Sequence, residues 1–224
     1  MTYEEYIRYH NRGDAGVEER MIASLAGSLK LNKWDSFRLI YFYTMTYHIP
    51  SALAMLIEGE RDMKKLQFRT DRRYVRCNGA YDRLLSELNE GMLDALLAVK
   101  TTTQAYSVVS SWFFFGRYAA FLFLEVYINV FKPRWKDDLV FKWEPKENYT
   151  KGAEYIVNSK DRVALNTFLE AAKIDTNDNC FAIETSLCAV AKFVKGTRYD
   201  GYYTERMLEE AEKSKYRELI YSNL

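Results

Sequence analysis

Two charged residues interrupt the most apolar stretch of the chain, residues 112–131. Arg117 and Glu125 both lie in "WFFFGRYAAFLFLEVY", where a charge requires a partner. Gly116 comes directly before Arg117. A glycine at a helix start lets a phosphate approach the backbone, where free N–H groups and the positive end of the helix dipole bind it. The spacing predicts an anion site at Gly116 and Arg117. The alternative is a tightly packed helix start in which Glu125 is paired for structural reasons.

A second cluster is basic. The sequence "RTDRRYVR" at residues 69–76 holds four arginines in eight residues. The guanidinium group is planar and binds two phosphate oxygens at once, so Arg72 and Arg73 are candidate phosphate ligands. The alternative is a basic face that contacts only solvent. The sequence favours neither interpretation.

The third cluster runs from residue 180 to residue 207. Glu184, Cys188 and Lys192 recur every four residues, so they share one face of the expected helix. The next segment, "TRYDGYYTER", interleaves tyrosine rings, on which bases can stack, with arginines that can hold a nucleic-acid backbone. Alternatively, the tyrosines pack on the core, and Cys188 is a small core residue rather than a nucleophile. The segment contributes Arg198, Tyr199, Tyr202, Tyr203 and Arg206.

Composition narrows the class of protein. The chain has 224 residues, of which 48% are apolar and 28% charged, which is typical of one folded, helix-rich domain covering residues 1–224. The net charge of +1 gives no bulk argument for nucleic-acid binding. Three cysteines without C-x-x-C spacing favour a reduced intracellular protein, and the separation of His10 and His48 predicts no metal site. Phosphate-loop, dinucleotide-binding and zinc-hydrolase signatures are absent from the sequence.

Residues 112–131 are also the one candidate for a membrane span, since their length matches a bilayer. Gly116, Arg117 and Glu125 interrupt them, and a charge in mid-span costs at least a few kcal/mol. We therefore expect a buried helix. The polar start "MTYEEYIRYHNRGD" is unlike a signal peptide, which favours a cytoplasmic protein with no membrane partner.

Helical periodicity covers almost the whole chain, so the sequence predicts an all-α fold of about nine or ten helices. Thr2 and Glu5 form a capping-box pattern, and Pro50 suits the first turn of a helix that Gly59 ends. The helical period of apolar residues is lost at residues 132–152, which predicts a long loop there, with "LVFKW" as one short strand. The expected buried stripe of the helix at about 179–195 consists of Ile183, Leu187, Val190 and Val194. Other helices are expected at 17–29, 33–48, 80–88, 91–99, 101–112, 160–173 and 203–216.

Four blocks of sequence, taken together, resemble one known family. They are "YFYTMTYHIPSALAML", "DRRYVRCNGAYDRLL", "FFFGRYAAFLFLEVY" and "AIETSLCAVAKFVKGTRYDGYY", in this order between residues 37 and 207. The chain is similar to the amino acid:DNA transferases of bacterial viruses, also described as α-glutamyl/putrescinyl thymine pyrophosphorylases, which are related to the helical DNA glycosylases. The stretch around Gly116 resembles the second half of a helix-hairpin-helix element. It reads "FFFG" where those glycosylases usually have proline-glycine, and their downstream aspartate has no clear match, so the resemblance implies that the glycosidic bond stays intact.

The resemblance implies a specific reaction. Family members act on double-stranded viral DNA in which thymine is replaced by 5-hydroxymethyluracil that carries a diphosphate. They displace this diphosphate with the amine of an amino acid, often glycine, and form a C–N bond. The implied partners are therefore modified DNA and an amino acid, in the cytoplasm of an infected bacterium. No resident cofactor and no metal site is implied, although a divalent cation could accompany the diphosphate.

The same resemblance assigns roles to the three clusters. Enclosing the activated base requires flipping it out of the duplex. The amine must lose a proton, for which Glu184 is slightly preferred over Glu125 as the base. The diphosphate and the DNA phosphates require fixed donors, for which we expect Gly116, Arg117, Arg72, Arg73, Arg198 and Lys192. Base stacking is assigned to Tyr118, Tyr199, Tyr202 and Tyr203. We expect these residues to converge on one cavity.

Three other interpretations remain open from the sequence. The chain could be a DNA-binding module without catalytic activity, which would need no carboxylate. It could be the helical part of a hydroxymethyluracil DNA kinase, which would consume a nucleotide. It could also be a small interaction protein whose tyrosines only fill its core, and steeply salt-dependent DNA binding would exclude that.

Overall fold

The computed structural model covers residues 1–224 and describes all of them except the side chains of Thr70, Asp71 and Arg73. In the described chain, regular structure consists of thirteen α-helices and two short 3-10 helices. In place of a sheet there is one isolated bridge, between Thr101 and Lys136. The prediction of an all-α fold is confirmed. The contacts divide the chain into two compact units, Met1–Val17 with Asp137–Arg206, and Glu18–Lys136 with Met207–Leu224.

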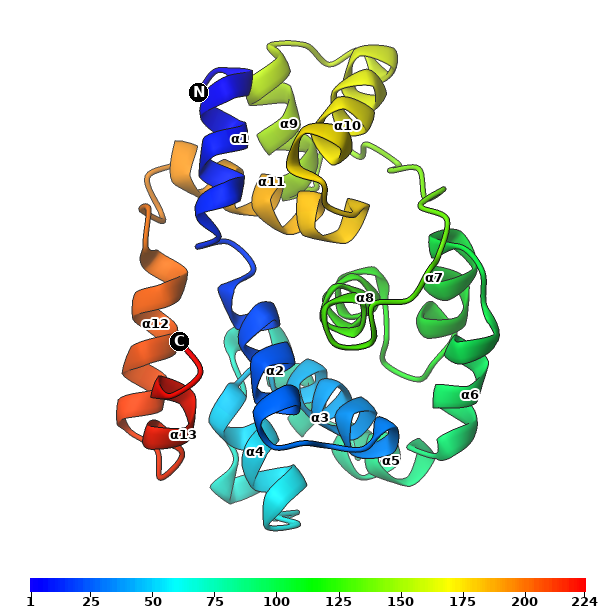
Figure 1. Cartoon of the computed structure of the whole chain (residues 1–224), viewed down its shortest axis with the longest axis vertical. Coiled ribbons are helices and arrows are strands. Elements are labelled where there is room, and N and C mark those ends of the chain that lie inside the picture. Colours follow the sequence, from blue (N-terminus) through cyan, green and yellow to red (C-terminus); the bar gives the residue numbers. More distant parts are fainter. The chain divides into compact units, whose positions relative to one another are not determined.

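The first unit is a small group of helices in which α9 lies along α11 (Figure 1). It consists of α1 (Tyr3–Arg12), α9 (Asn148–Val157), α10 (Arg162–Thr176), α11 (Cys180–Val194) and the first turn of α12 (Tyr202–Glu212). The predicted capping box is present, because Glu5 N donates to Thr2 Oγ1 (3.2 Å) and Thr2 N donates to Glu5 Oε2 (2.6 Å). At Gly152 of α9 an added Cβ would lie 2.1 Å from the carbonyl oxygen of Leu187. Only glycine therefore allows α9 to approach α11 so closely.

The second unit is larger, and its core lies between α3 and α8. Phe37 of α3 and Phe123 of α8 are fully buried, with ring centroids 5.5 Å apart. Both helices are apolar around most of their circumference, as expected for helices enclosed by their neighbours. The unit contains α2 (Val17–Ser28), α3 (Lys33–Thr46), α4 (Ile49–Ile57), the 3-10 helices η1 (Met63–Lys65) and η2 (Thr70–Arg76), α5 (Ala80–Glu87), α6 (Glu90–Ala98), α7 (Thr102–Ser110), α8 (Arg117–Phe131), the rest of α12, and α13 (Arg217–Tyr221).

The long loop is shorter than predicted. It ends at residue 147, because α9 begins at Asn148, so the expectation of a loop as far as residue 152 is wrong. Within it Leu139, Phe141 and Trp143 are buried, whereas Val140 is 67% exposed. This is the alternation of a strand, but the described residues provide no neighbouring strand to pair with it. Burial of every second side chain anchors the loop instead.

Two details of the predicted helices also need correction. Of the predicted stripe in α11, Ile183, Leu187 and Val190 are fully buried, but Val194 is 42% exposed because it lies at the end of the helix. The predicted last helix, 203–216, ends early, because α12 stops at Glu212, and the prediction missed the short helix α13, which begins at Arg217. In the described chain none of the helices combines the length and the apolar character that crossing a membrane requires.

Candidate functional site

The carboxylate of Glu184 is buried in the first unit, on α11. The start of this helix is capped by Asn179, whose side-chain oxygen accepts from the N–H groups of Phe181 and Ala182. Glu184 is 6% exposed, and the thiol of Cys188, one turn further on, donates to its Oε1 at 3.4 Å. Cys188 is therefore positioned to orient the carboxylate.

Arginine and tyrosine side chains gather where the chain turns from α11 into α12. Gly196 adopts a left-handed conformation (φ 67°) that ends α11. The guanidinium of Arg198 lies 4.0 Å from the ring centroid of Tyr202, and that of Arg206 lies 5.5 Å from the same ring. Tyr199 meets Tyr202 edge to face at 5.6 Å and is 52% exposed. Tyr202 is already covered by a cation, so Tyr199 is the more accessible ring for stacking.

These two groups of residues are neighbours. Burial raises the pKa of Tyr203 to about 12, while the positive charges of Arg206 and Arg198 lower it. The guanidinium of Arg206 lies 5.2 Å from the ring centroid of Tyr203, and the Tyr202 and Tyr203 rings meet edge to face at 5.3 Å. Cys188 also acts electrostatically on the Tyr203 hydroxyl. The first unit thus brings together Glu184, its donor Cys188, and the Arg198–Arg206 turn. Hereafter this group, Glu184, Cys188, Arg198, Tyr199, Tyr202, Tyr203 and Arg206, is called the acid–arginine cluster.

Lys192 anchors this cluster through its backbone. Its carbonyl oxygen accepts from both the N–H and the hydroxyl group of Thr197, each at 3.0 Å. The side chain, which is partly exposed, lies one turn beyond Cys188 on the same face of α11. Lys192 is therefore placed to add a cation at the edge of the acid–arginine cluster.

Asp14 holds the cluster in place, and sequence reasoning missed it. It is 6% exposed, and its Oδ1 accepts from Thr204 N at 2.9 Å and from Thr204 Oγ1 at 2.8 Å. Tyr203 N donates to its other oxygen at 3.4 Å. A side chain from residue 14 thus caps α12. No local pattern reveals a cap whose two partners are separated by 190 residues.

In the second unit, α8 begins without a side-chain cap. Gly116 precedes the helix with an ordinary φ of −61° and provides no side-chain cap. A Cβ at Gly116 would meet nothing within 4 Å, so there is space in front of the first turn. Arg117 lies over the ring of Phe121, with 5.2 Å between the guanidinium carbon and the ring centroid. The geometry is compatible with the predicted approach of an anion.

Tyr118 stacks with an arginine from η2. The guanidinium of Arg72 lies 5.0 Å from the Tyr118 ring centroid, and Tyr47 meets the same ring at 6.2 Å. Tyr118 is 40% exposed, so part of its ring remains accessible. Gly116, Arg117, Tyr118 and Arg72 thus form a second group, called here the α8 group.

Glu125 lies two turns further along α8, where it is 2% exposed. It belongs to the second unit and Glu184 to the first, so the expectation that both acids meet at one cavity stays a prediction. The same holds for the convergence of Arg117 with Arg198 and Tyr202.

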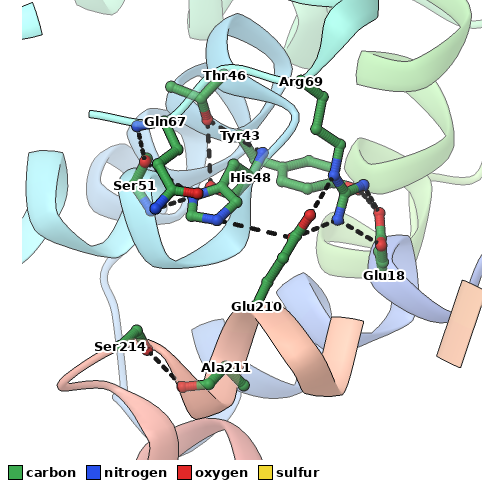
Figure 2. Close-up of polar contacts among 10 residues, drawn as sticks. All are labelled: Glu18, Tyr43, Thr46, His48, Ser51, Gln67, Arg69, Glu210, Ala211 and Ser214. Carbon is green, nitrogen blue, oxygen red and sulfur yellow. Dashed lines mark hydrogen bonds and ion pairs between the residues drawn. The ribbon is translucent and has the colours of Figure 1, made fainter. Parts of the chain in front are cut away.

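Two arginines of the basic segment at residues 69–76, Arg69 and Arg72, do not lie on a solvated face. Arg69 forms a bidentate pair with Glu210 and also binds both oxygens of Glu18 (Figure 2). Arg72 is only 7% exposed. The interpretation as a purely solvent-facing surface is therefore wrong for these two arginines. The side chain of Arg73 lies outside the described residues, so its role stays a prediction.

A further polar network joins α1 to α11. Ser186 Oγ lies 3.0 Å from His10 Nδ1, and His10 Nε2 lies 3.2 Å from Asp178 Oδ2. Serine, histidine and aspartate in this order could relay a proton, but Ser186 is 1% exposed and its hydroxyl also reaches Ile183 O at 3.0 Å. A substrate cannot reach it, so the network is structural. Sequence reasoning missed it because residues 10 and 186 are far apart along the chain.

No group of three or more histidine, cysteine, aspartate or glutamate side chains in the described structure is placed to hold a metal ion. Comparison with known proteins gives no match, whether to a protein-family model, a curated protein or a solved structure. The resemblance of the sequence blocks to amino acid:DNA transferases, and of the fold to helix-hairpin-helix glycosylases, therefore stays a prediction.

Proposed function

We propose that the protein is a DNA-modifying transferase that joins the amine of an amino acid, such as glycine, to diphosphate-activated 5-hydroxymethyluracil. The observation that carries this proposal is the acid–arginine cluster, in which a buried carboxylate accepts from Cys188, and Cys188 interacts with Tyr203 next to the rings that Arg198 and Arg206 cover. A reaction that takes a proton from an amine and releases diphosphate requires such a combination. The sequence blocks that resemble the family give the proposal its substrate.

The chemical step is a displacement at carbon. The amine nitrogen attacks the methylene carbon attached to C5 of the base, and the bond between that carbon and the diphosphate oxygen breaks. Diphosphate leaves with the bonding electrons, and the proton lost by the nitrogen passes to the carboxylate of Glu184. Because Glu184 is buried, bulk water does not compete for its oxygens. The hydrogen bond from Cys188 orients the carboxylate toward the amine.

Arg198 and Lys192 are the cations that stabilise the departing diphosphate. Charge that develops during a reaction is stabilised best by groups that need not move to reach it. Arg198 meets this requirement because it stacks on Tyr202. The exposed ring of Tyr199 receives the base once it has left the duplex, and stacking there offsets part of the few kcal/mol that flipping costs.

The α8 group contributes DNA binding. The N–H groups of the first turn of α8 bind a backbone phosphate, with Arg117 beside them. Tyr118 and Arg72 provide a ring and a cation. A second candidate function is therefore a DNA-binding module without catalysis, because the contacts of the α8 group need no carboxylate.

The test is direct detection of the product. The protein is incubated with DNA that carries diphosphorylated 5-hydroxymethyluracil and with single amino acids or polyamines, and the DNA is digested to nucleosides for mass spectrometry. We expect an aminomethyl adduct and an equal amount of released diphosphate. DNA binding without any adduct would contradict the transferase and support the binding module. Consumption of a nucleotide would instead indicate the helical part of a kinase.

A further inference from the structure

The second unit contains a polar cavity of about 260 Å³. One wall is formed by the start of α4, which contributes the apolar side chains of Pro50 and Ala54, and the other by Glu210 and Lys213 near the end of α12. Binding pockets for drug-sized molecules are larger, roughly 300–1,000 Å³. The cavity therefore suits a ligand of only a few heavy atoms.

His48 contributes a hydrogen-bond donor to this cavity. It caps α4, since Ser51 N donates to its Nδ1 at 3.2 Å, and Ser51 Oγ lies 2.8 Å from the same atom. Burial, followed by the charge of Arg69, lowers the pKa of His48 to about 4, so the ring is neutral at pH 7. A neutral imidazole whose Nδ1 accepts must carry its proton on Nε2. The helix cap thus fixes the tautomer.

The Nε2–H group has nothing to donate to. His48 is 4% exposed, and Nε2 has no hydrogen-bond partner among the described residues. The nearest carboxylate oxygen, Oε2 of Glu210, is 3.8 Å away (Figure 2). Glu210 is held by Arg69, which donates to Oε1 at 2.9 Å and to Oε2 at 2.5 Å. A buried donor without an acceptor destabilises the folded state, so a ligand oxygen at this position would stabilise the protein.

One cation that lines the cavity is left for a ligand. Each lining carboxylate is paired with a cation, although Glu210 shares Arg69 with Glu18. Glu58 pairs with Lys215, Glu60 pairs with Lys65 at 3.2 Å, and Glu210 pairs with Arg69. Lys213 has no ion-pair partner among the residues that the structure describes. The groups left for a ligand are therefore two donors, the imidazole N–H of His48 and the ammonium of Lys213.

We propose that this cavity binds a small metabolite through an oxyanion, a carboxylate or a phosphate, that accepts from His48 Nε2 and pairs with Lys213. The short apolar part of such a ligand lies against Pro50 and Ala54. Arg69 contributes by holding Glu210 away from His48, so that the donor stays available. The proposal does not depend on the transferase activity.

NMR of the imidazole nitrogens tests the proposal, because the protein has only two histidines. The free protein should show His48 as the neutral tautomer with its proton on Nε2. Acetate, glycine and inorganic phosphate are then titrated at constant ionic strength, with His10→Gln used for assignment. We expect a saturable shift of the His48 Nε2 signals, while the His10 signals do not move. The probe that binds more tightly, acetate or phosphate, identifies the oxyanion as a carboxylate or a phosphate. A charged His48 at pH 7, or no saturable shift with any of the three probes, overturns the proposal.

Two variants sharpen the test. Lys213→Gln should lower the affinity for the probe roughly fivefold, which is the upper range for an exposed ion pair. Lys64→Gln, an exposed lysine of the same unit outside the cavity, should bind like the native chain. His48→Asn keeps an oxygen that can cap α4 but removes the Nε2 donor, so thermal stabilisation by the probe should disappear. The proposal is contradicted if the two lysine variants bind the probe equally well. It is also contradicted if the probe stabilises His48→Asn against heat as much as it stabilises the native chain.

Discussion

Glu18 and Glu19 of α2 place two carboxyl groups side by side in the core of the second unit. They are 2% and 3% exposed, and the hydroxyl of Tyr43 reaches both, at 3.0 and 3.2 Å. Arg69 binds Glu18 directly. Burial first, and the charge of Glu18 second, raise the pKa of Glu19 to about 7. Glu19 therefore keeps its proton in the folded protein at pH values where the unfolded chain has lost it.

The stability of the second unit should consequently depend on Glu19. Between about pH 4.5 and pH 7 the folded state binds a proton at Glu19 that the unfolded state has released, so this residue lowers stability as the pH rises. His48 acts in the opposite direction, because its folded pKa of about 4 means that only the unfolded state is protonated between about pH 4 and pH 6.5. The two effects oppose each other over most of this range and conceal one another in the native chain.

Glu19→Gln should separate them. The free energy of unfolding of this variant, relative to the native chain, is expected to increase between pH 4.5 and pH 8 by on the order of 3 kcal/mol, because the proton linked to Glu19 is gone. Urea unfolding at several pH values measures the difference, with the value at pH 4.5 as the internal reference. A difference that stays constant with pH would show that Glu19 ionises in the folded protein as it does in the unfolded chain.

At the scale of elements, the first unit depends on the approach of α9 to α11. Gly152 faces the backbone of Leu187, and neither α9 nor α11 can yield at that point without losing helical hydrogen bonds. Gly27, inside α2, offers a matched comparison, because a Cβ there would meet nothing within 4 Å. The two glycines share a helical environment and differ in the space around them.

Replacing each glycine by alanine should therefore have opposite effects. Gly152→Ala is expected to lower the free energy of unfolding by about 3 kcal/mol or more, because the methyl group forces the two helices apart. Gly27→Ala should raise it by roughly 0.5–1 kcal/mol, since alanine is the better helix former. Chemical denaturation compares the two variants. Equal stabilities would mean that α9 does not pack against α11 as described.

The elements also show which features the sequence could predict. Helices with a clear apolar period, a capping box or a proline in the first turn were predictable, because those signals act within a few residues. The helix α9 was missed since it follows a proline-rich loop and contains the glycine that its packing requires. Glu184 and the arginines of the turn after α11 could be grouped from the sequence because they lie within 23 residues of each other. Asp14 was not predictable from a local pattern.

At the scale of the whole molecule, the proposed functions divide between the units. The acid–arginine cluster belongs to the first unit, while the α8 group and the His48 cavity belong to the second. A net charge of +1 means that DNA binding must come from local groups rather than from a general positive field. The catalytic claim therefore depends on Glu184, and on the acid–arginine cluster around it, more than on any other residue.

The most direct test compares Glu184→Gln with Glu209→Gln, an exposed glutamate of α12, in single-turnover reactions on diphosphate-activated DNA. Glutamine keeps the shape of residue 184 and its ability to accept from Cys188 but cannot take a proton. We predict that the rate of adduct formation falls by roughly 10²–10⁴-fold in Glu184→Gln and is unchanged in Glu209→Gln, while both bind the DNA as the native chain does. Equal rates in the two variants would contradict the role of Glu184 as the base, and with it the proposed mechanism.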